Sequence, residues 1–339
     1  MLALSHQPSH SPSPALKLRL NSLLSMESIS SPIKSPEPTD IPPCEAHEDC
    51  KLPTDIVLRS SDGRRFGTHT RNLEIYGDGF PIRVSSTSET REDVVLSESS
   101  DVVHLLLQFM HNRPQPDLRT TPFELLSKLA EAAQKYCVYS AIGICKLLME
   151  RNAQEHSFEV YVYASRAGYA DIREKAGTLA IAQNPLRVFS YAVWANDVYT
   201  RDKAAWATLD LDADDVIYSL SRYYTVFTKW HHIFVAWVKF RDHIYATYYE
   251  TLRNPPHIKR EHIAGDCLKW NEIYPKLLVK LMTEKPSLDS FVDAVEEYVY
   301  LIEDCLTCSD GVDRWRTQIA AALSGASTFS SFVKAPLST

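Results

Sequence analysis

The pattern of apolar and polar positions changes character twice along the chain. Residues 1–50 carry no sustained apolar periodicity, but they hold eight of the chain's nineteen prolines and many serines. Such a composition cannot bury enough apolar surface to offset the entropy lost on ordering. Residues 1–50 are therefore predicted to form a disordered Ser/Pro-rich tail.

The same segment contains four Ser-Pro steps. An exposed Ser-Pro step is an acceptor for proline-directed phosphorylation, which would add charge and strong hydrogen-bond acceptors to the tail. Ser-Pro pairs are also common in any Pro/Ser-rich linker, and composition favours this plainer interpretation. The four serines are Ser11, Ser13, Ser31 and Ser35.

A strand-like pattern begins near residue 52. The apolar run 56–58, the turn residues 60–63 and the run 65–70 predict two strands joined as a hairpin, because an Asp-Gly pair lies between them. Residues 73–76 predict a short helix before Gly-rich sequence, and 94–96 predict a further short strand.

Helical spacing then continues to the end of the chain. Ser99 or Ser100 is predicted to cap one helix, and Thr121 to cap the next, with Pro122 in its first turn and Glu124 three residues after the cap. No strand pair is indicated after residue 152. Further helices are predicted over about 141–151, 157–168, 170–182, 186–208, 222–254, 263–284, 288–305 and 311–324.

These elements predict an α+β fold class with three parts. A tail (1–50) precedes a domain in which helices flank a small sheet (51–152), and an all-α region (153–335) follows. All six tryptophans come after residue 193, which predicts a separate core for the helical region.

The order of elements in 51–152 resembles the BTB/POZ domain. Asp55 opens a strand as in that family, and Phe66 and His69 are similar to its F-x-A-H-K step. Segment 162–168 resembles the V-Y-A-x-A-x-R-x-G sequence that is frequent in the helical continuation of fungal BTB proteins. Other matching positions are the apolar anchor Leu73, Phe80 near the Tyr–Phe pair, Leu106 and Phe109 in the L-x-F-I-Y helix, and Leu126 and Tyr136 in the L-L-x-A-A-x-Y helix.

This resemblance implies a non-catalytic protein–protein interaction protein that binds itself or another protein through the domain. An alternative is a substrate adaptor of a cullin-type ubiquitin ligase. The nearest match to the family's cullin-binding apolar-x-Glu step is 96–98, which lies at a strand end and not after the expected helix. Weak or no cullin binding is therefore expected. The family histidine has a structural role, which implies that His69 is a packing residue with Asp55 as a nearby polar partner.

The composition limits which classes of binding partner and which cellular compartment are expected. A net charge of −7 and the absence of long Lys/Arg runs disfavour nucleic acid, because phosphate binding needs clustered cations. No apolar run is long enough for a membrane span. Seven cysteines without a secretory signal pattern indicate reduced thiols and an intracellular, cytoplasmic or nuclear protein.

The sequence offers no recognisable catalytic motif. It contains neither a Gly-rich phosphate-binding loop nor a G-x-S-x-G elbow, so no enzyme and no cofactor is predicted. The best metal candidate is the pair Cys305 and Cys308 with Cys267 and His262, since thiolates and imidazoles suit zinc. A single C-x-x-C pair is a weak signal, and no metal site is predicted.

Overall fold

The computed structural model describes residues 41–81, 93–223, 227–256, 268–302 and 304–333. Residues 1–40 of the predicted tail lie outside this part of the chain. Residues 41–50 do not continue the tail, because Ala46 is buried and Pro42 lies directly on the sheet. A Cβ atom added to Gly67 would lie 1.7 Å from the carbonyl oxygen of Pro42. The predicted tail boundary at residue 50 is therefore too late, since this short Pro-rich piece is held by contacts that composition does not reveal.

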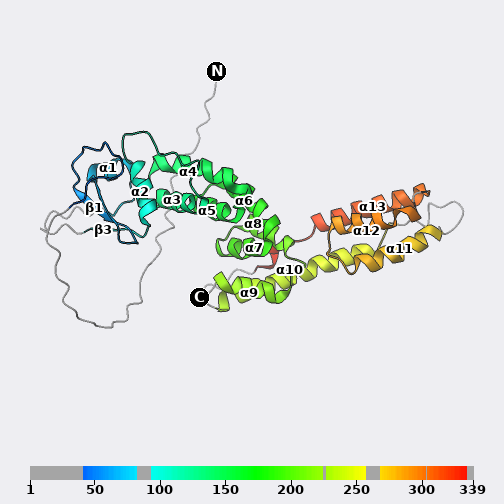
Figure 1. Ribbon diagram of the computed structural model, residues 1–339. Helices are drawn as coiled ribbons and strands as arrows, with labels where there is room; N and C mark the ends of the chain where they lie inside the picture. Colours follow the sequence, from blue (N-terminus) through cyan, green and yellow to red (C-terminus); the bar gives the residue numbers. More distant parts are fainter. Residues whose placement is uncertain (1–40, 82–92, 224–226, 257–267, 303, 334–339) are drawn as a thin grey trace, which may run out of the picture. The chain divides into compact units, whose positions relative to one another are not determined.

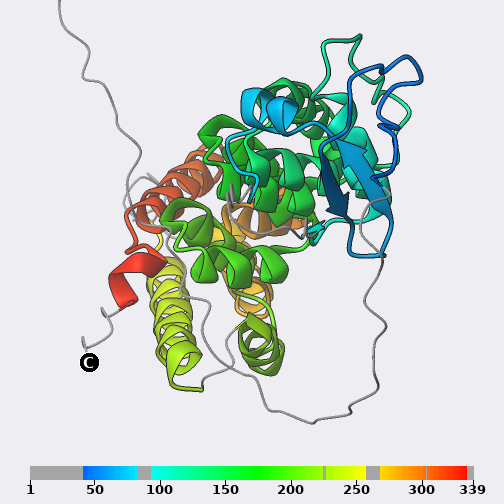
Figure 2. The same ribbon diagram turned by 90° about the vertical axis from the view of Figure 1, so that its left-hand side faces the viewer.

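A small mixed sheet forms the start of the fold. Strand β1 (Ile56–Arg59) pairs antiparallel with β2 (Arg65–Thr68) and parallel with β3 (Val94–Val95), giving the order β2-β1-β3. Figure 2 shows the two blue strands of the hairpin side by side. Gly63 in the turn has φ +86°, a conformation that glycine adopts without strain. The predicted hairpin and third strand are confirmed.

Thirteen α-helices accompany the sheet within the described residues, which confirms the α+β class. The first four are α1 (Thr70–Tyr76), α2 (Ser100–Gln108), α3 (Phe123–Tyr136) and α4 (Tyr139–Arg151). The others are α5 (Ser157–Ala167), α6 (Ala170–Gln183), α7 (Pro185–Trp194), α8 (Val198–Ala207), α9 (Ala213–Tyr223), α10 (Phe227–Arg253), α11 (Leu268–Leu281), α12 (Leu288–Tyr298) and α13 (Leu306–Ser324). Helix α9 was not predicted, and α10 begins five residues later than the predicted stripe at 222.

The helix caps differ from the prediction in the first domain. Ser99 is the N-cap residue of α2, as predicted, but its side chain makes no capping hydrogen bond. Pro122, and not the predicted Thr121, is the N-cap of α3. At α2 the capping acceptor is Asp62 from the hairpin turn, whose Oδ1 accepts from the backbone N–H of Ser100 at 3.0 Å. A residue 38 positions away thus satisfies a free helix N–H group, which no local pattern predicts.

Helices α3 to α8 stack as antiparallel pairs. The pairs α3/α4, α5/α6 and α7/α8 are each in close contact, and α6 also contacts α8 while α3 contacts α5. Helices α4, α6 and α8 therefore follow one another along one side of the stack, and α3, α5 and α7 along the other (Figure 1). Gly168, with φ +76°, ends α5 and lets the chain turn directly into α6.

Two hydrophobic cores hold the described chain together. The first runs from Ala46 through the sheet and helices α1–α9 to Ile244 in α10, so it crosses residue 152 without a break. The second joins the end of α10, from Tyr248 onward, to α11, α12 and α13. After α13 the chain returns to the first core through Phe329. The prediction of one separate core for the helical region is therefore wrong, and only its last part has a core of its own.

Candidate metal centre and contact surfaces

The residues singled out by the family resemblance lie mostly inside the fold. Phe80 is half-buried and its ring stacks on that of Tyr136 at 4.3 Å between centroids, while Asp55 is exposed. Side chains in the core shape the domain and cannot themselves contact a partner. The buried ones are Phe66, His69, Leu73, Leu106, Phe109, Leu126 and Tyr136.

The predicted polar pair of His69 and Asp55 does not form. Asp55 lies just before β1, and its Oδ1 accepts from the backbone N–H of Thr70 at 2.7 Å, at the start of α1. His69 instead donates from Nδ1 to the carbonyl oxygen of Pro53 at 2.9 Å. The free N–H groups at a helix start attract a carboxylate, and this interaction takes Asp55 away from the imidazole.

His69 belongs to a compact group of four metal-binding side chains. The ligand atoms of Cys44, Cys50, His69 and His111 all lie within 4.8 Å of one another. The Sγ–Nε2 distance is 3.3 Å both from Cys44 to His111 and from Cys50 to His69. Two thiols and two imidazoles are the donor set of a Cys2His2 zinc site.

Separate parts of the fold bring these four side chains together. Cys44 and Cys50 come from the segment 41–50, His69 is the N-cap of α1 directly after β2, and His111 follows α2. The ring of His111 is also covered by His47, whose centroid is 5.5 Å away. Both histidines of the cluster are buried and both cysteines are half-buried.

Burial shifts the pKa of one cysteine and one histidine of this cluster. Burial raises the pKa of the Cys44 thiol to about 11. Burial also lowers the pKa of His111, and the nearby His69 and His47 contribute to this shift. The low-dielectric surroundings thus disfavour charge on these two groups when no cation is present.

The sequence pattern did not predict this cluster, and the metal candidate that it suggested involves other cysteines. Cys308 is buried in the second core, and Cys305 is the N-cap of α13. Cys267 and His262 lie outside the described residues. The local signal for the cluster was the pair Cys44 and Cys50, whose spacing is longer than the usual C-x2–4-C.

Glu98 connects the end of β3 to α3. Its carboxylate accepts from Tyr136 Oη at 2.5 Å and from Lys135 Nζ at 2.8 Å. Burial opposes ionisation, but the hydrogen bonds from Lys135, Tyr136 and Ser97 together lower the pKa of Glu98. Burial and the adjacent carboxylate raise the pKa of Tyr136. Since Leu96 is buried as well, the apolar-x-Glu step at 96–98 is used within the domain.

Replacing Glu98 by Gln is expected to destabilise the domain in a pH-dependent way. Folding lowers the pKa of Glu98 from its ordinary 4.5, so its stabilisation is fully present above that value and is lost as pH falls through the lower folded value. We expect a loss of about 1–2 kcal/mol at neutral pH. Urea unfolding should show the stabilities of wild type and Glu98→Gln converging as the pH falls below 4.5 and through the lowered folded-state pKa. The exposed Glu74→Gln serves as control, and a difference that persists unchanged in acid would contradict this assignment.

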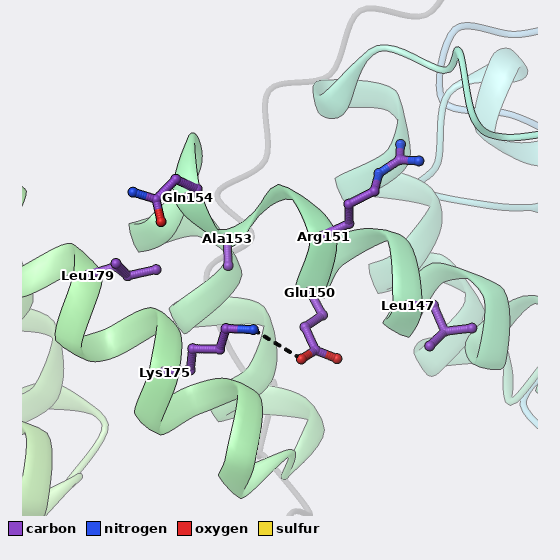
Figure 3. Close-up of a pocket in the computed structure, with 7 residues that line it drawn as sticks. All are labelled: Leu147, Glu150, Arg151, Ala153, Gln154, Lys175 and Leu179. Atoms are coloured by element: carbon purple, nitrogen blue, oxygen red, sulfur yellow. Dashed lines mark hydrogen bonds and ion pairs between the residues drawn. The ribbon is translucent and has the colours of Figure 1, made fainter.

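A shallow hollow opens between α4 and α6. Its lining is mixed: Leu147 and Leu179 supply apolar surface, and Lys175 pairs with Glu150 at 3.3 Å across it (Figure 3). Leu147 is 68% exposed and so offers apolar surface to the solvent. The remaining lining residues are Arg151, Ala153 and Gln154.

Comparison of the chain with protein-family models, curated proteins and solved structures found no match. The resemblance to BTB/POZ domains therefore depends on the residues and on the order of elements alone. In the part of the chain that the structure describes, no helix has the length and apolar character needed to cross a membrane.

Proposed function

We propose that this chain is a non-catalytic, intracellular protein–protein interaction protein, in which a BTB/POZ-like domain is extended by a stack of helix pairs. The observation that carries the proposal is the stack itself, which leaves one continuous side of α4, α6 and α8 facing outward (Figure 1). Stacked helix pairs provide extended surfaces that suit binding to other proteins.

The exposed side of α4, α6 and α8, here called the even-helix face, has the composition of a contact surface. Leu147 on α4 and Tyr199 on α8 are 68% and 48% exposed. Tyr199 is held in place because its hydroxyl donates to Glu174 of α6 at 2.6 Å. An aromatic ring that is already fixed in position loses little entropy when a partner binds. The nearby charges of Lys175 and Glu150 can orient the partner on this face.

The N-terminal domain supports the same proposal through a second surface. Its order of hairpin, helix, strand and helices agrees with the layout that the resemblance implies. On α1, Leu73 points into the core whereas Ile75 is 60% exposed. Because the first helix carries the dimer contact in the family that the domain resembles, Ile75 is the residue through which we expect self-association.

The alternative role as a cullin adaptor is less well supported. The carboxylate of Glu98 is engaged by Lys135 and Tyr136, and its side chain is only 13% exposed. A cullin would have to break these contacts before it could use the step at 96–98.

Proximity labelling in the native cell, combined with sedimentation of the purified full-length protein, tests the proposal. We expect Leu147→Glu to reduce enrichment of the principal partners about tenfold, as for loss of a contact residue at an interface centre. Tyr218→Glu on α9, where the side chain is 67% exposed, is the matched control and should leave enrichment unchanged. We expect Ile75→Glu to convert any dimer to monomer.

The outcomes separate the parts of the proposal. Wild-type protein that stays monomeric over a wide concentration range would refute self-association. A partner set that is the same for Leu147→Glu, Tyr218→Glu and wild type would refute the even-helix face as the binding surface. Tight binding of a purified cullin N-terminal domain would replace the proposal with the adaptor role.

A further inference from the structure

We propose that Cys44, Cys50, His69 and His111 bind a Zn(II) ion as a structural site that fastens the segment 41–50 to the domain. The distances between the ligand atoms fit a zinc ion. With Zn–S near 2.3 Å and Zn–N near 2.0 Å, a tetrahedral zinc ion sets its ligand atoms roughly 3.3–3.8 Å apart. Both Sγ–Nε2 pairs here are 3.3 Å apart, and all four ligand atoms fall within 4.8 Å.

The two imidazoles are also oriented as zinc ligands. The Nδ1 atom of His69 lies 2.9 Å from the carbonyl oxygen of Pro53, and the Nδ1 atom of His111 lies 2.7 Å from that of Leu107. A carbonyl oxygen can only accept, so each Nδ1 carries the proton and each Nε2 has its lone pair directed at the cysteines. Zinc-binding histidines are held in this way, with the non-ligating nitrogen hydrogen-bonded to an acceptor.

The chemistry of binding requires no other reactant. Two Zn–S bonds and two Zn–N bonds form, water leaves the ion, and the two thiol protons pass to solvent. No electron is transferred. Because four protein ligands fill a tetrahedral zinc ion, no position remains for water or substrate, and the site is structural and not catalytic.

The position of the cluster explains what the ion would stabilise. The segment 41–50 has no regular hydrogen-bonded element and lies against β2, where the missing side chain of Gly67 makes room for Pro42. The ion would join this segment to the β2–α1 junction and to the end of α2. Small surface segments without a core of their own are commonly held by such cross-links.

Metal analysis and cobalt substitution of the full-length chain, purified without a histidine tag under reducing conditions, test this proposal. We expect about one zinc ion per chain, and Co(II) replacing it should give the intense visible bands of a tetrahedral thiolate site. Removal of zinc by a chelator should lower the melting temperature by at least about 5 °C, reversibly on adding Zn(II).

Four variants locate the site. Cys50→Ser and His111→Ala should weaken zinc binding more than about 100-fold. A loss of this size exceeds the effect of removing a residue that only hydrogen-bonds to a ligand. His47→Gln and Cys305→Ser are matched controls and should bind zinc within about threefold of wild type. His47 touches His111 but its Nε2 is directed at the carbonyl oxygen of Gln108, and Cys305 belongs to the rival C-x-x-C pair. Circular dichroism of each chelated variant checks that it is folded.

Three results would overturn the proposal. The first is wild-type protein that takes up no zinc from a Zn(II) titration. The second is equal zinc and equal cobalt spectra in Cys50→Ser and Cys305→Ser. The third is a Cys44–Cys50 disulfide found by mass spectrometry in protein from reducing cells. None of these results depends on partner binding, so the proposal fails or stands separately from the proposed function.

Discussion

Replacing Trp315 by alanine is expected to reduce the local free energy of unfolding of α11–α13 by about 3–5 kcal/mol. Trp315 is fully buried in the second core, where its ring packs edge-on against Phe291 at 5.1 Å between centroids. Its Nε1 donates to the carbonyl oxygen of Thr251 at 3.2 Å and so connects α13 to α10. The alanine leaves a large cavity and removes one of the two hydrogen bonds that the Thr251 carbonyl oxygen accepts, the other coming from the backbone N–H of Asn254 at 3.3 Å. Hydrogen–deuterium exchange of peptides from α11–α13 measures the loss.

Two comparisons show whether the effect belongs to the second core. Leu306→Ala removes an 81% exposed side chain from the same helix and should change protection by less than about 0.5 kcal/mol. Peptides from α2 and α3 should keep their protection in Trp315→Ala, because they belong to the first core. Equal loss of protection in both cores would mean that the two cores unfold as one unit.

Replacing Asp197 by alanine is expected to destabilise the helix stack by about 2–4 kcal/mol. Asp197 is the N-cap of α8 and accepts from the backbone N–H of Thr200 at 3.4 Å. The same carboxylate accepts from Tyr161 Oη of α5 at 3.1 Å and lies 3.7 Å from Arg173 Nε of α6. Its loss removes a helix cap and leaves a buried tyrosine hydroxyl without this acceptor. Urea unfolding monitored by circular dichroism measures the change.

Asp197→Asn is the matched control for this prediction. Asparagine keeps the volume and a capping oxygen, so we expect less than half the cost of the alanine variant. An equal loss in both variants would assign the effect to the negative charge opposite Arg173 and not to the cap and the tyrosine hydrogen bond. Because Asp197 joins α5, α6 and α8, the alanine variant should also reduce partner binding at the even-helix face.

The sequence predicted the secondary structure well where local signals coincide. The hairpin at β1 and β2 followed from an Asp-Gly turn between apolar runs, and the end of α5 followed from Gly168, whose left-handed backbone terminates a helix. Helix α9 was missed although its sequence is amphipathic, with Val216 and Leu220 buried four residues apart. This apolar pattern is shorter than the aromatic stripe that follows it in α10.

The family resemblance implied a structural role for His69, but the residues around it could not be predicted. Its expected partner Asp55 caps α1, and its actual neighbours include Cys50, from a segment predicted to be disordered, and His111, 42 residues further along. Contacts at such separations depend on how the strands and helices pack, and the spacing of the residues in the chain does not encode them.

The sequence by itself thus determined the α+β class, the position of the hairpin and most helices, because turn residues, caps and apolar periodicity act within a few positions of the chain. Only the tertiary structure decided that residues 41–50 lie on the sheet, that the first core crosses residue 152, and that two cysteines and two histidines meet. These features come from loop closure and side-chain packing between distant segments, whose free energy no local sequence pattern reports.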